Sequence, residues 1–471
     1  MLLSLLCLSL AASPILGPWP SAFPAKALCS NCGLCKSSVG VSSVADACAF
    51  LGDGMSRLEK LEPAVHGRGR EYEQGDLAEA HFGVHESIKL AAGVGIEGAQ
   101  WTGVATGVAL ELLESGAVDA AVVASSSGEA FGGPEPLLCR SGEEILRGRR
   151  VKPSLCPSLA VLDEVAADPA ITRLLFTGVG CAVQALRAMN GGDPEKALGL
   201  EKGGLLVLGT HCVDNSPSPE AARRFVASIP GVGEERAADV TAYEFMADFR
   251  VHARVKVEGG GEETVKQAYM TLPPSVGIPS IAPSCFSCFD YTNGLADLVV
   301  GYMGAPFEGG KDEMQRAPLM VTVRNERGRG MLDAAVRGGK VRILQEGGRG
   351  GAALPSSGSR AAITMKTVAA DSMVKSLLDP GFVAGDRGAP AWLGNILAAI
   401  IARGLPKGLE FARFSIDYHY LRNRLYVEKE MRGRTGGGER HVPEFAKAIM
   451  HRYEEDMAGL RGRGVGGGEK E

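Results

Sequence analysis

The alternation of apolar and polar residues is clearest between residues 99 and 126, where a helical period gives way to a strand-like run. Val104, Val108 and Leu112 recur at the spacing of one helix face, after a start rich in small residues. The run VDAAVVAS at 118–125 is short, apolar and partly β-branched, which is typical of a buried strand. The pattern therefore predicts a helix followed by a strand.

Later segments continue this alternation. Residues 171–189 indicate a strand, a glycine turn and a helix, and residues 203–215 indicate another strand and turn. The alternation predicts an α/β core with a mostly parallel sheet, in a chain that is α+β overall. Residues 317–344 then predict strand, helix and strand, and residues 404–427 predict a charged amphipathic helix.

The chain begins with an uncharged apolar stretch, and its first charged residue is Lys26. The apolar run of about ten residues is too short to cross a bilayer and predicts a targeting leader over 1–25, with an element of the fold as the alternative. The letters SAFP around Phe23 resemble the leader motif of plastids of red-algal secondary origin. Residues 392–405 have the length of a buried or interfacial helix, so no transmembrane segment is expected.

Composition narrows the class of protein. The 471 residues allow two or three domains, and 50 basic against 55 acidic side chains give no electrostatic footprint for nucleic acid. The 64 glycines concentrate at 258–263, 345–360 and 461–471, which we interpret as flexible insertions or a disordered tail.

Four of the eleven cysteines, Cys29, Cys32, Cys35 and Cys48, follow the leader closely. A C-x-x-C-x-x-C run suits one face of a four-iron cluster, because each iron takes one protein thiolate. Zinc sites more often use two separated C-x-x-C pairs, and this spacing is awkward for disulfides. Iron–sulfur is favoured, with zinc and disulfides as alternatives.

A second group of cysteines comes from three separate loops. Gly178 and Gly209 each end a predicted strand in a G-x-x-C pattern, and a C-x-x-C follows a Pro-Ser turn near residue 284. Because ligands gather at the carboxyl ends of parallel strands, we expect these thiols to share one metal site, with scattered buried cysteines as the alternative. The four thiols are Cys181, Cys212, Cys285 and Cys288.

Two four-thiol sites suggest single-electron centres in series, for which a flavin is the usual one-to-two-electron converter. The predicted helix start with Thr102, Gly103 and Thr106 offers free N–H groups to a phosphate, with helix-start packing as the alternative. No complete G-x-G-x-x-G follows a strand, so a Rossmann nicotinamide site is not indicated.

At this point several long motifs carry a resemblance. They include CSNCGLC, EPAVHGRGR, GAQWTG, LGTHCVDN, YEFMADF, APSCFSCFDYTNGLADLVVGYMGAP and PKGLEFARFSIDYH. Together, over roughly residues 27–425, the motifs resemble the family of the beta subunit of deazaflavin-reducing hydrogenases. Within it they resemble the chlorophyll-pigment reductases, which act on 7-hydroxymethyl chlorophyll a or on the 8-vinyl group of divinyl chlorophyllide.

The resemblance implies FAD, two 4Fe-4S clusters, reduced ferredoxin as electron donor and a chlorophyll-type pigment as substrate. It implies the same two cysteine sets as cluster ligands. The predicted flavin contacts are Gln100, Trp101, Thr102, Gly103, Thr106, Lys152 and Ser154. The candidate proton donors are His85, Asp290 and Tyr291, with His66 and His211 also near the motifs and a structural role as the alternative for each. Ala182 departs from the Gln that the family commonly has there, and Cys139 and Cys156 are not family features.

The predicted organisation is a leader at 1–25, an iron–sulfur segment at 26–95, a flavin domain at 96–175, an iron–sulfur and flavin domain at 176–345 and a C-terminal region at 346–471. The expected location is the plastid stroma, with peripheral thylakoid association and a homo-oligomer left open. An electron-transfer subunit of a larger redox complex and a zinc-binding interaction protein are the alternative functions.

Overall fold

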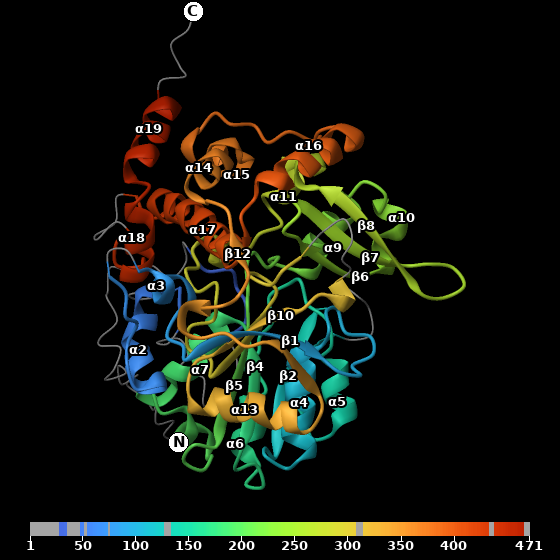
Figure 1. Cartoon of the computed structure of the whole chain (residues 1–471), viewed down its shortest axis with the longest axis vertical. Helices are drawn as coiled ribbons and strands as arrows, with labels where there is room; N and C mark the ends of the chain where they lie inside the picture. The colour runs from blue at the N-terminus through green and yellow to red at the C-terminus, as the bar shows by residue number, and fades with distance from the viewer. Residues whose placement is uncertain are drawn as a thin grey trace, which may run out of the picture.

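The structure is a computed structural model that describes residues 28–34, 48–50, 54–73, 76–126, 133–307, 314–432 and 438–465. The predicted leader at 1–25, Cys35 and the end of the glycine-rich tail lie outside these residues. Figure 1 shows a large sheet covered by helices, with a smaller sheet and a group of C-terminal helices toward one end.

The large sheet has eight strands in the order β11-β1-β10-β9-β5-β4-β2-β3. The pairings that link β2, β4, β5 and β9 are parallel, and those on either side are antiparallel. The predicted parallel core is therefore confirmed, with antiparallel strands at both edges. The strands are β1 (Ser87–Gly93), β2 (Ala120–Ser126), β3 (Pro134–Cys139), β4 (Leu174–Gly178), β5 (Leu205–Thr210), β9 (Leu298–Gly301), β10 (Leu319–Val323) and β11 (Val341–Gln345).

Two smaller sheets complete the strands. The antiparallel sheet β6-β7-β8 includes a hairpin whose turn is the glycine-rich stretch at 258–263, so this stretch joins two paired strands. A short pair, β12 with β13, lies next to the C-terminal helices. The strands are β6 (Val240–Phe245), β7 (Arg250–Lys256), β8 (Glu262–Ala268), β12 (Ser356–Ser357) and β13 (Lys407–Gly408).

Helices cover both faces of the large sheet (Figure 1). The helices are α2 (Arg57–His66), α3 (Ala78–Phe82), α4 (Val104–Glu114), α5 (Gly142–Arg147), α6 (Leu162–Ala167), α7 (Gly180–Ala188), α8 (Pro194–Leu198), α9 (Pro219–Ala227), α10 (Gly233–Arg236), α11 (Pro274–Gly277), α12 (Pro283–Phe286), α13 (Glu326–Arg337), α14 (Ala361–Ala370), α15 (Ser372–Leu378), α16 (Ala391–Gly404), α17 (Leu409–Glu430), α18 (Glu444–His451) and α19 (Glu454–Val465). No helix in the described ranges is long and apolar enough to span a bilayer.

Each central strand is buried on both faces. In β4, Leu174 and Phe176 belong to the core shared with α7 and α17, whereas Leu175 belongs to the core shared with α4 and α13. Alternate residues of a strand point to opposite faces, so both sets must be apolar. This double burial explains why the strands appear in the sequence as continuous apolar runs.

The predicted helix-to-strand segment is confirmed as α4 and β2, and the predicted amphipathic close is confirmed as α17. The latter helix is 22 residues long and is buried along much of its length, including the polar residues Asp417, Arg422 and Asn423. Its charged positions therefore belong to the interior of the protein, beside the candidate site.

Candidate functional site

The four thiols of the second predicted set line one cavity at the carboxyl ends of the central strands. Gly178 of β4 pairs with Gly209 of β5, so the two G-x-x-C turns leave the sheet at the same level. Cys181 then lies in the first turn of α7, and Cys212 lies in the loop after β5. Cys285 of α12 and Cys288 reach the same cavity from a third loop.

Two glycines let the backbone approach this cavity closely. A Cβ atom on Gly180 would lie 2.5 Å from Oδ2 of Asp290, and one on Gly209 would lie 2.5 Å from Nδ2 of Asn293. Such contacts are far shorter than ordinary van der Waals distances. The strand ends therefore require glycine because the loop that follows the C-x-x-C packs directly against them.

The C-x-x-C loop is fixed from outside by α17. The Nδ2 group of Asn423 donates to the carbonyl oxygens of Cys285 and Cys288, at 3.2 and 2.6 Å. Beside it, Arg422 donates to both carboxylate oxygens of Asp214 at 2.7 Å. Burial opposes the charge of Asp214, but the guanidinium of Arg422 holds the pKa of this carboxyl well below its usual value.

Hydrogen-bond donors also reach the sulfur atoms. The backbone N–H of Asp290 donates to Sγ of Cys288 at 3.4 Å, and Nδ2 of Asn215 donates to Sγ of Cys212 at 3.8 Å. Donors of this kind stabilise negative charge on sulfur and tune the potential of iron–sulfur centres.

The protonation chemistry of the thiols fits a metal cluster. Burial raises the pKa of Cys285 to about 12 and raises the pKa of Cys181 well above its usual value, so thiolates here require a strong positive charge nearby. Among the described residues, no three His, Cys, Asp or Glu side chains stand close enough to hold a single metal ion. A four-iron cluster has a different requirement, because each of its thiolates binds a separate iron.

The N-terminal cysteine segment lies against the second set. Cys29, Cys32 and Cys48 are in the described ranges, and Cys35 is not. The N–H of Ser284, next to Cys285, donates to Oγ of Ser30 at 2.7 Å. Charge on Cys32 also contributes to the raised pKa of Cys181, which places these two thiols in the same neighbourhood.

The three predicted proton donors have different surroundings. Asp290 and Tyr291 line the cavity of the second cysteine set. Oδ1 of Asp290 accepts from the N–H of Gly294 at 2.7 Å, whereas its buried Oδ2 atom has no hydrogen-bond partner in the described structure. The hydroxyl of Tyr291 is 3.4 Å from Oγ of Ser415.

His85 is instead enclosed by backbone groups. Its Nδ1–H donates to the carbonyl of Gly83 at 2.7 Å, and its Nε2 accepts from the N–H of Gly350 at 2.8 Å. Burial lowers the pKa of His85 to about 4, so the ring is neutral and both nitrogens are occupied. This geometry favours a structural role for His85.

The other two histidines also differ. His66 donates from Nε2 to the carbonyl of Gly294 at 2.8 Å and accepts at Nδ1 from Asn325 at 3.1 Å. His211 is buried, and neither ring nitrogen has a hydrogen-bond partner among the described residues. Burial lowers the pKa of both histidines to about 3.

The predicted flavin segment meets an acidic residue that the sequence pattern did not single out. Gln100 donates from Nε2 to Oε1 of Glu244 in β6 at 2.8 Å and accepts at Oε1 from the N–H of Val151. Trp101 also hydrogen-bonds Glu244 and stacks on Tyr302 with ring centroids 4.8 Å apart. Burial raises the pKa of Glu244 to about 8.

The remaining predicted flavin residues surround the start of α4 and the loop before α6. Thr102 has a buried hydroxyl with no partner among the described residues, and Gly103 precedes α4 with φ of 86°. Thr106 lies in the first turn. Lys152 donates to the carbonyls of Arg149 and Arg150, and burial lowers its pKa to about 8. Ser154 is buried and pairs with Ser216 of the loop that follows Cys212.

Comparison with known proteins identifies the family. The model for the N-terminal part of the coenzyme F420 hydrogenase/dehydrogenase beta subunit matches residues 91–163, and the model for its C terminus matches residues 171–346. The chain belongs to this family. The resemblance predicted from the motifs is therefore confirmed.

The relatives cover the chain almost completely. The chloroplastic 7-hydroxymethyl chlorophyll a reductase of Oryza sativa is 44% identical over 92% of this chain and 84% of its own length. An uncharacterized protein of Nostoc is 39% identical over 92% of this chain and 94% of its own length. The coenzyme F420 hydrogenase subunit beta of Methanosarcina barkeri is 27% identical over 44% of this chain and 66% of that protein. A chain of the F420-reducing [NiFe] hydrogenase complex from the same organism aligns with 22% identity over 58% of this chain and 85% of that chain, with a TM-score of 0.45.

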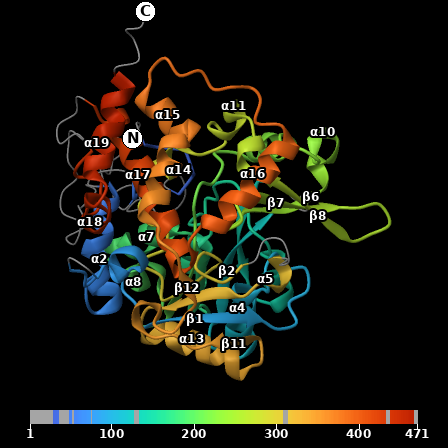
Figure 2. The same cartoon turned by 45° about the horizontal axis from the view of Figure 1, so that its top comes forward.

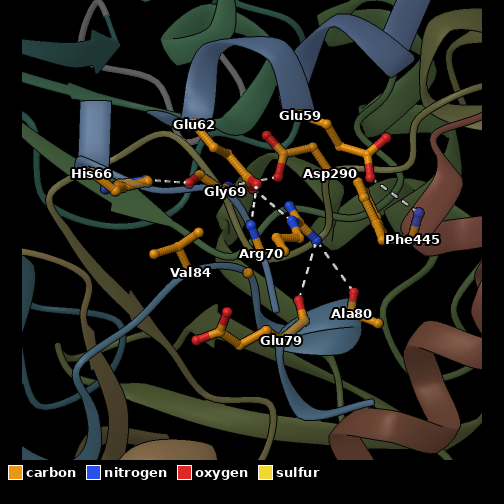
Figure 3. Close-up of polar contacts among 12 residues, drawn as sticks. Glu59, Glu62, His66, Gly69, Arg70, Glu79, Ala80, Val84, Asp290 and Phe445 are labelled. Atoms are coloured by element: carbon orange, nitrogen blue, oxygen red, sulfur yellow. Dashed lines mark hydrogen bonds and ion pairs between the residues drawn. The ribbon is translucent and has the colours of Figure 1, made fainter. Parts of the chain in front are cut away.

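One family motif, EPAVHGRGR, supplies a buried ion pair beside the site. Nε of Arg70 is 2.5 Å from Oε1 of Glu62, and the guanidinium lies 3.6 Å above the ring of Phe445. Figure 3 shows that Arg70 also reaches the carbonyls of α3, with Asp290 close to the pair. The motif thus fastens α2 to α3 and α18 around the loop that carries the cysteines.

The departures from the family pattern are peripheral. Ala182 is buried in α7, next to Cys181. Cys139 is buried at the end of β3, and Cys156 lies in the loop after Ser154. Neither cysteine lines the cavity of the second set.

Proposed function

We propose that this protein is an iron–sulfur flavoprotein reductase that reduces a chlorophyll-type pigment with electrons from reduced ferredoxin in the plastid. The observation that carries the proposal is the convergence of Cys181, Cys212, Cys285 and Cys288 on one cavity. The identity of 44% to a chloroplastic chlorophyll reductase supports both the pigment and the compartment.

The cysteine environment supports two adjacent clusters. Cys29, Cys32, Cys35 and Cys48 would hold one 4Fe-4S cluster, and the cavity thiols would hold the other. The hydrogen bond between Ser284 and Ser30 brings the two segments into direct contact. Contact of this kind suits single-electron transfer between them.

The overall reaction needs two electrons and two protons. Reduction of 7-hydroxymethyl chlorophyll a converts the hydroxymethyl group to methyl and releases water. Reduction of divinyl chlorophyllide converts its 8-vinyl group to ethyl with no leaving group. Two reduced ferredoxins supply the electrons in either case, and the bound FAD would supply the two-electron chemistry that hydride transfer requires.

Glu244 is our candidate for holding one of the protons. Its carboxyl is half-exposed and lies beside Gln100 and Trp101, the predicted flavin contacts. With a pKa of about 8 this group is protonated at neutral pH, which is the state that a general acid needs. Asp290 and Tyr291 remain candidates on the opposite, cysteine-lined side.

The choice of pigment has evidence on both sides. The identity to the Oryza enzyme favours 7-hydroxymethyl chlorophyll a. The motifs GYMGAPF and ARFSID favour the 8-vinyl group, as does a leader of the red-algal type, because such algae usually lack the chlorophyll b from which the hydroxymethyl pigment derives. We therefore propose one active site with two candidate pigments.

The deciding experiment uses anaerobically purified holoprotein and chemically reduced ferredoxin. Each pigment is offered separately, and the product is identified by chromatography and absorbance. Turnover of one pigment supports the proposal and names the substrate. Failure to reduce either pigment, by a protein that contains both clusters and FAD, would refute it and favour the electron-transfer subunit.

The subunit alternative has its own support. Relatives named as hydrogenase or dehydrogenase beta subunits align with this chain over about 44% of its length. In that case the holoprotein would accept electrons from ferredoxin and reduce an artificial dye, but no pigment.

A further inference from the structure

Helix α16 presents an apolar face to solvent. Trp392, Ile396 and Ile400 are 69%, 52% and 57% exposed, and their spacing of four residues places them along one stripe. Figure 2 shows α16 on the outside of the molecule, in front of the β6-β7-β8 sheet. Exposed large apolar residues in a continuous row are unusual on a soluble surface and mark a contact site.

The opposite face of α16 is firmly attached to that sheet. Asn395 donates from Nδ2 to Oε1 of Gln267 at 2.9 Å and accepts at Oδ1 from the N–H of Ala268 at 3.2 Å. Arg250 donates to the carbonyl oxygen of Asn395 at 2.9 Å. A Cβ atom on Gly394 would lie 2.4 Å from the methyl group of Thr271, so the helix lies tightly on its support. The apolar stripe is therefore held outward by a fixed scaffold.

The charges around the stripe have one sign. No acidic residue occurs between Asp386 and Glu410, and the segment between them carries exposed Arg387, Arg403 and Lys407. Arg403 follows Ile400 by three residues, so it continues the stripe at the C-terminal end of the helix. A cationic rim around an apolar face complements an anionic lipid surface.

We propose that α16 is a membrane-docking helix that lies in the headgroup region of an anionic bilayer. Trp392 and the two isoleucines enter the boundary with the acyl chains, and Arg387, Arg403 and Lys407 contact lipid headgroups. The choice of membrane rests on the proposed function, because a chlorophyll-type pigment partitions into lipid. Docking would bring the protein to the phase that contains its substrate.

The area of the stripe favours lipid over a second copy of the chain. A helix of 14 residues is about 21 Å long and about 10 Å wide, so one face offers roughly 200 Å². A standard protein interface buries about 800 Å² on each partner. Insertion of a few side chains into lipid has no such lower limit.

The test is vesicle co-sedimentation of the full-length holoprotein. Vesicles of phosphatidylcholine alone are compared with vesicles that also contain phosphatidylglycerol. We expect binding to the anionic vesicles, and the triple variant Trp392→Gln, Ile396→Gln, Ile400→Gln should bind roughly tenfold more weakly. The double variant Arg403→Gln, Lys407→Gln should lose roughly tenfold in binding to anionic vesicles only.

A matched control replaces exposed apolar residues elsewhere. Val336 and Leu344 are 38% and 46% exposed on α13 and β11, and the variant Val336→Gln, Leu344→Gln should bind vesicles as the unchanged protein does. Equal loss in the control and the triple variant, or no binding by the unchanged protein, would overturn the proposal. Self-association that only the triple variant abolishes, without vesicle binding, would instead assign the stripe to a second copy.

Pigment reduction in detergent solution separates this proposal from the proposed function. The triple variant should reduce dissolved pigment at the unchanged rate, because α16 carries no residue of the candidate site. Vesicle binding by a protein that reduces no pigment would refute the proposed function and leave the docking helix standing.

Discussion

Substitution of Glu244 by glutamine tests the proposed proton donor. Glutamine keeps an oxygen that can accept from Gln100 and Trp101, so the hydrogen bonds around the side chain survive while its acidic proton is lost. With a pKa of about 8, about nine in ten Glu244 carboxyls carry a proton at pH 7. A carboxyl at its usual pKa would carry one in only about one molecule in three hundred.

The expected loss of rate is between about a hundredfold and ten thousandfold, the range for removal of a general acid. The assay is single-turnover pigment reduction by anaerobic holoprotein, with flavin and iron content measured separately. For the unchanged protein the rate should be level below pH 8 and should fall about tenfold for each further pH unit, because the protonated form is the active one. The variant should show no such fall.

The control is Glu263→Gln on β8, where the side chain is half-exposed and ion-paired with Arg236. This variant should keep the rate and the pH profile of the unchanged protein. If Glu244→Gln retains full activity with normal cofactor content, or keeps the fall above pH 8, the assignment of Glu244 is wrong.

Three further predictions concern the clusters and the interior. Cys285→Ser should remove about half of the bound iron and leave the opening cluster, Cys32→Ser should do the reverse, and loss of all iron from either change would contradict two separate sites. Glu62→Ala leaves Arg70 buried without its carboxylate and should lower the free energy of unfolding by about 3–5 kcal/mol in chemical denaturation, with a loss under 1 kcal/mol counting against the buried pair. Asn423→Ala frees the two carbonyls that hold the C-x-x-C loop, so cluster absorbance should decay faster in air; an unchanged decay would show that the loop needs no such support.

Much of the fold could be predicted because its signals are local. The apolar runs of β4 and β5 and the glycines that end them are visible in the sequence, and parallel pairing then brings Cys181 and Cys212 to one edge. The antiparallel edges were not predicted, since β10 enters the sheet beside a strand from far along the chain.

The candidate site was predicted less completely, because its supporting contacts are long-range. Asn423 lies in a helix that we expected to be charged and without chemistry, and only the fold shows that it holds the cysteine loop. Glu244 could have been noticed as an acid in the apolar strand YEF, but its contact with Gln100 joins segments far apart in sequence. His85 illustrates the reverse case, in which a reactive side chain near a motif proves to be enclosed by backbone groups.

The position of β1 in the sheet has a consequence for how the protein is made. Strand β1 pairs with β10 and β11, although these strands leave the ribosome long after it does. Until they are synthesised, β1 has unpaired edges, and the Ser30 loop lacks its partner at Ser284. Non-local pairing of this kind slows folding and exposes apolar strands meanwhile. Cluster insertion is therefore a late event, and a chain that ends before β10 would hold every cavity cysteine without the strand that closes the sheet around them.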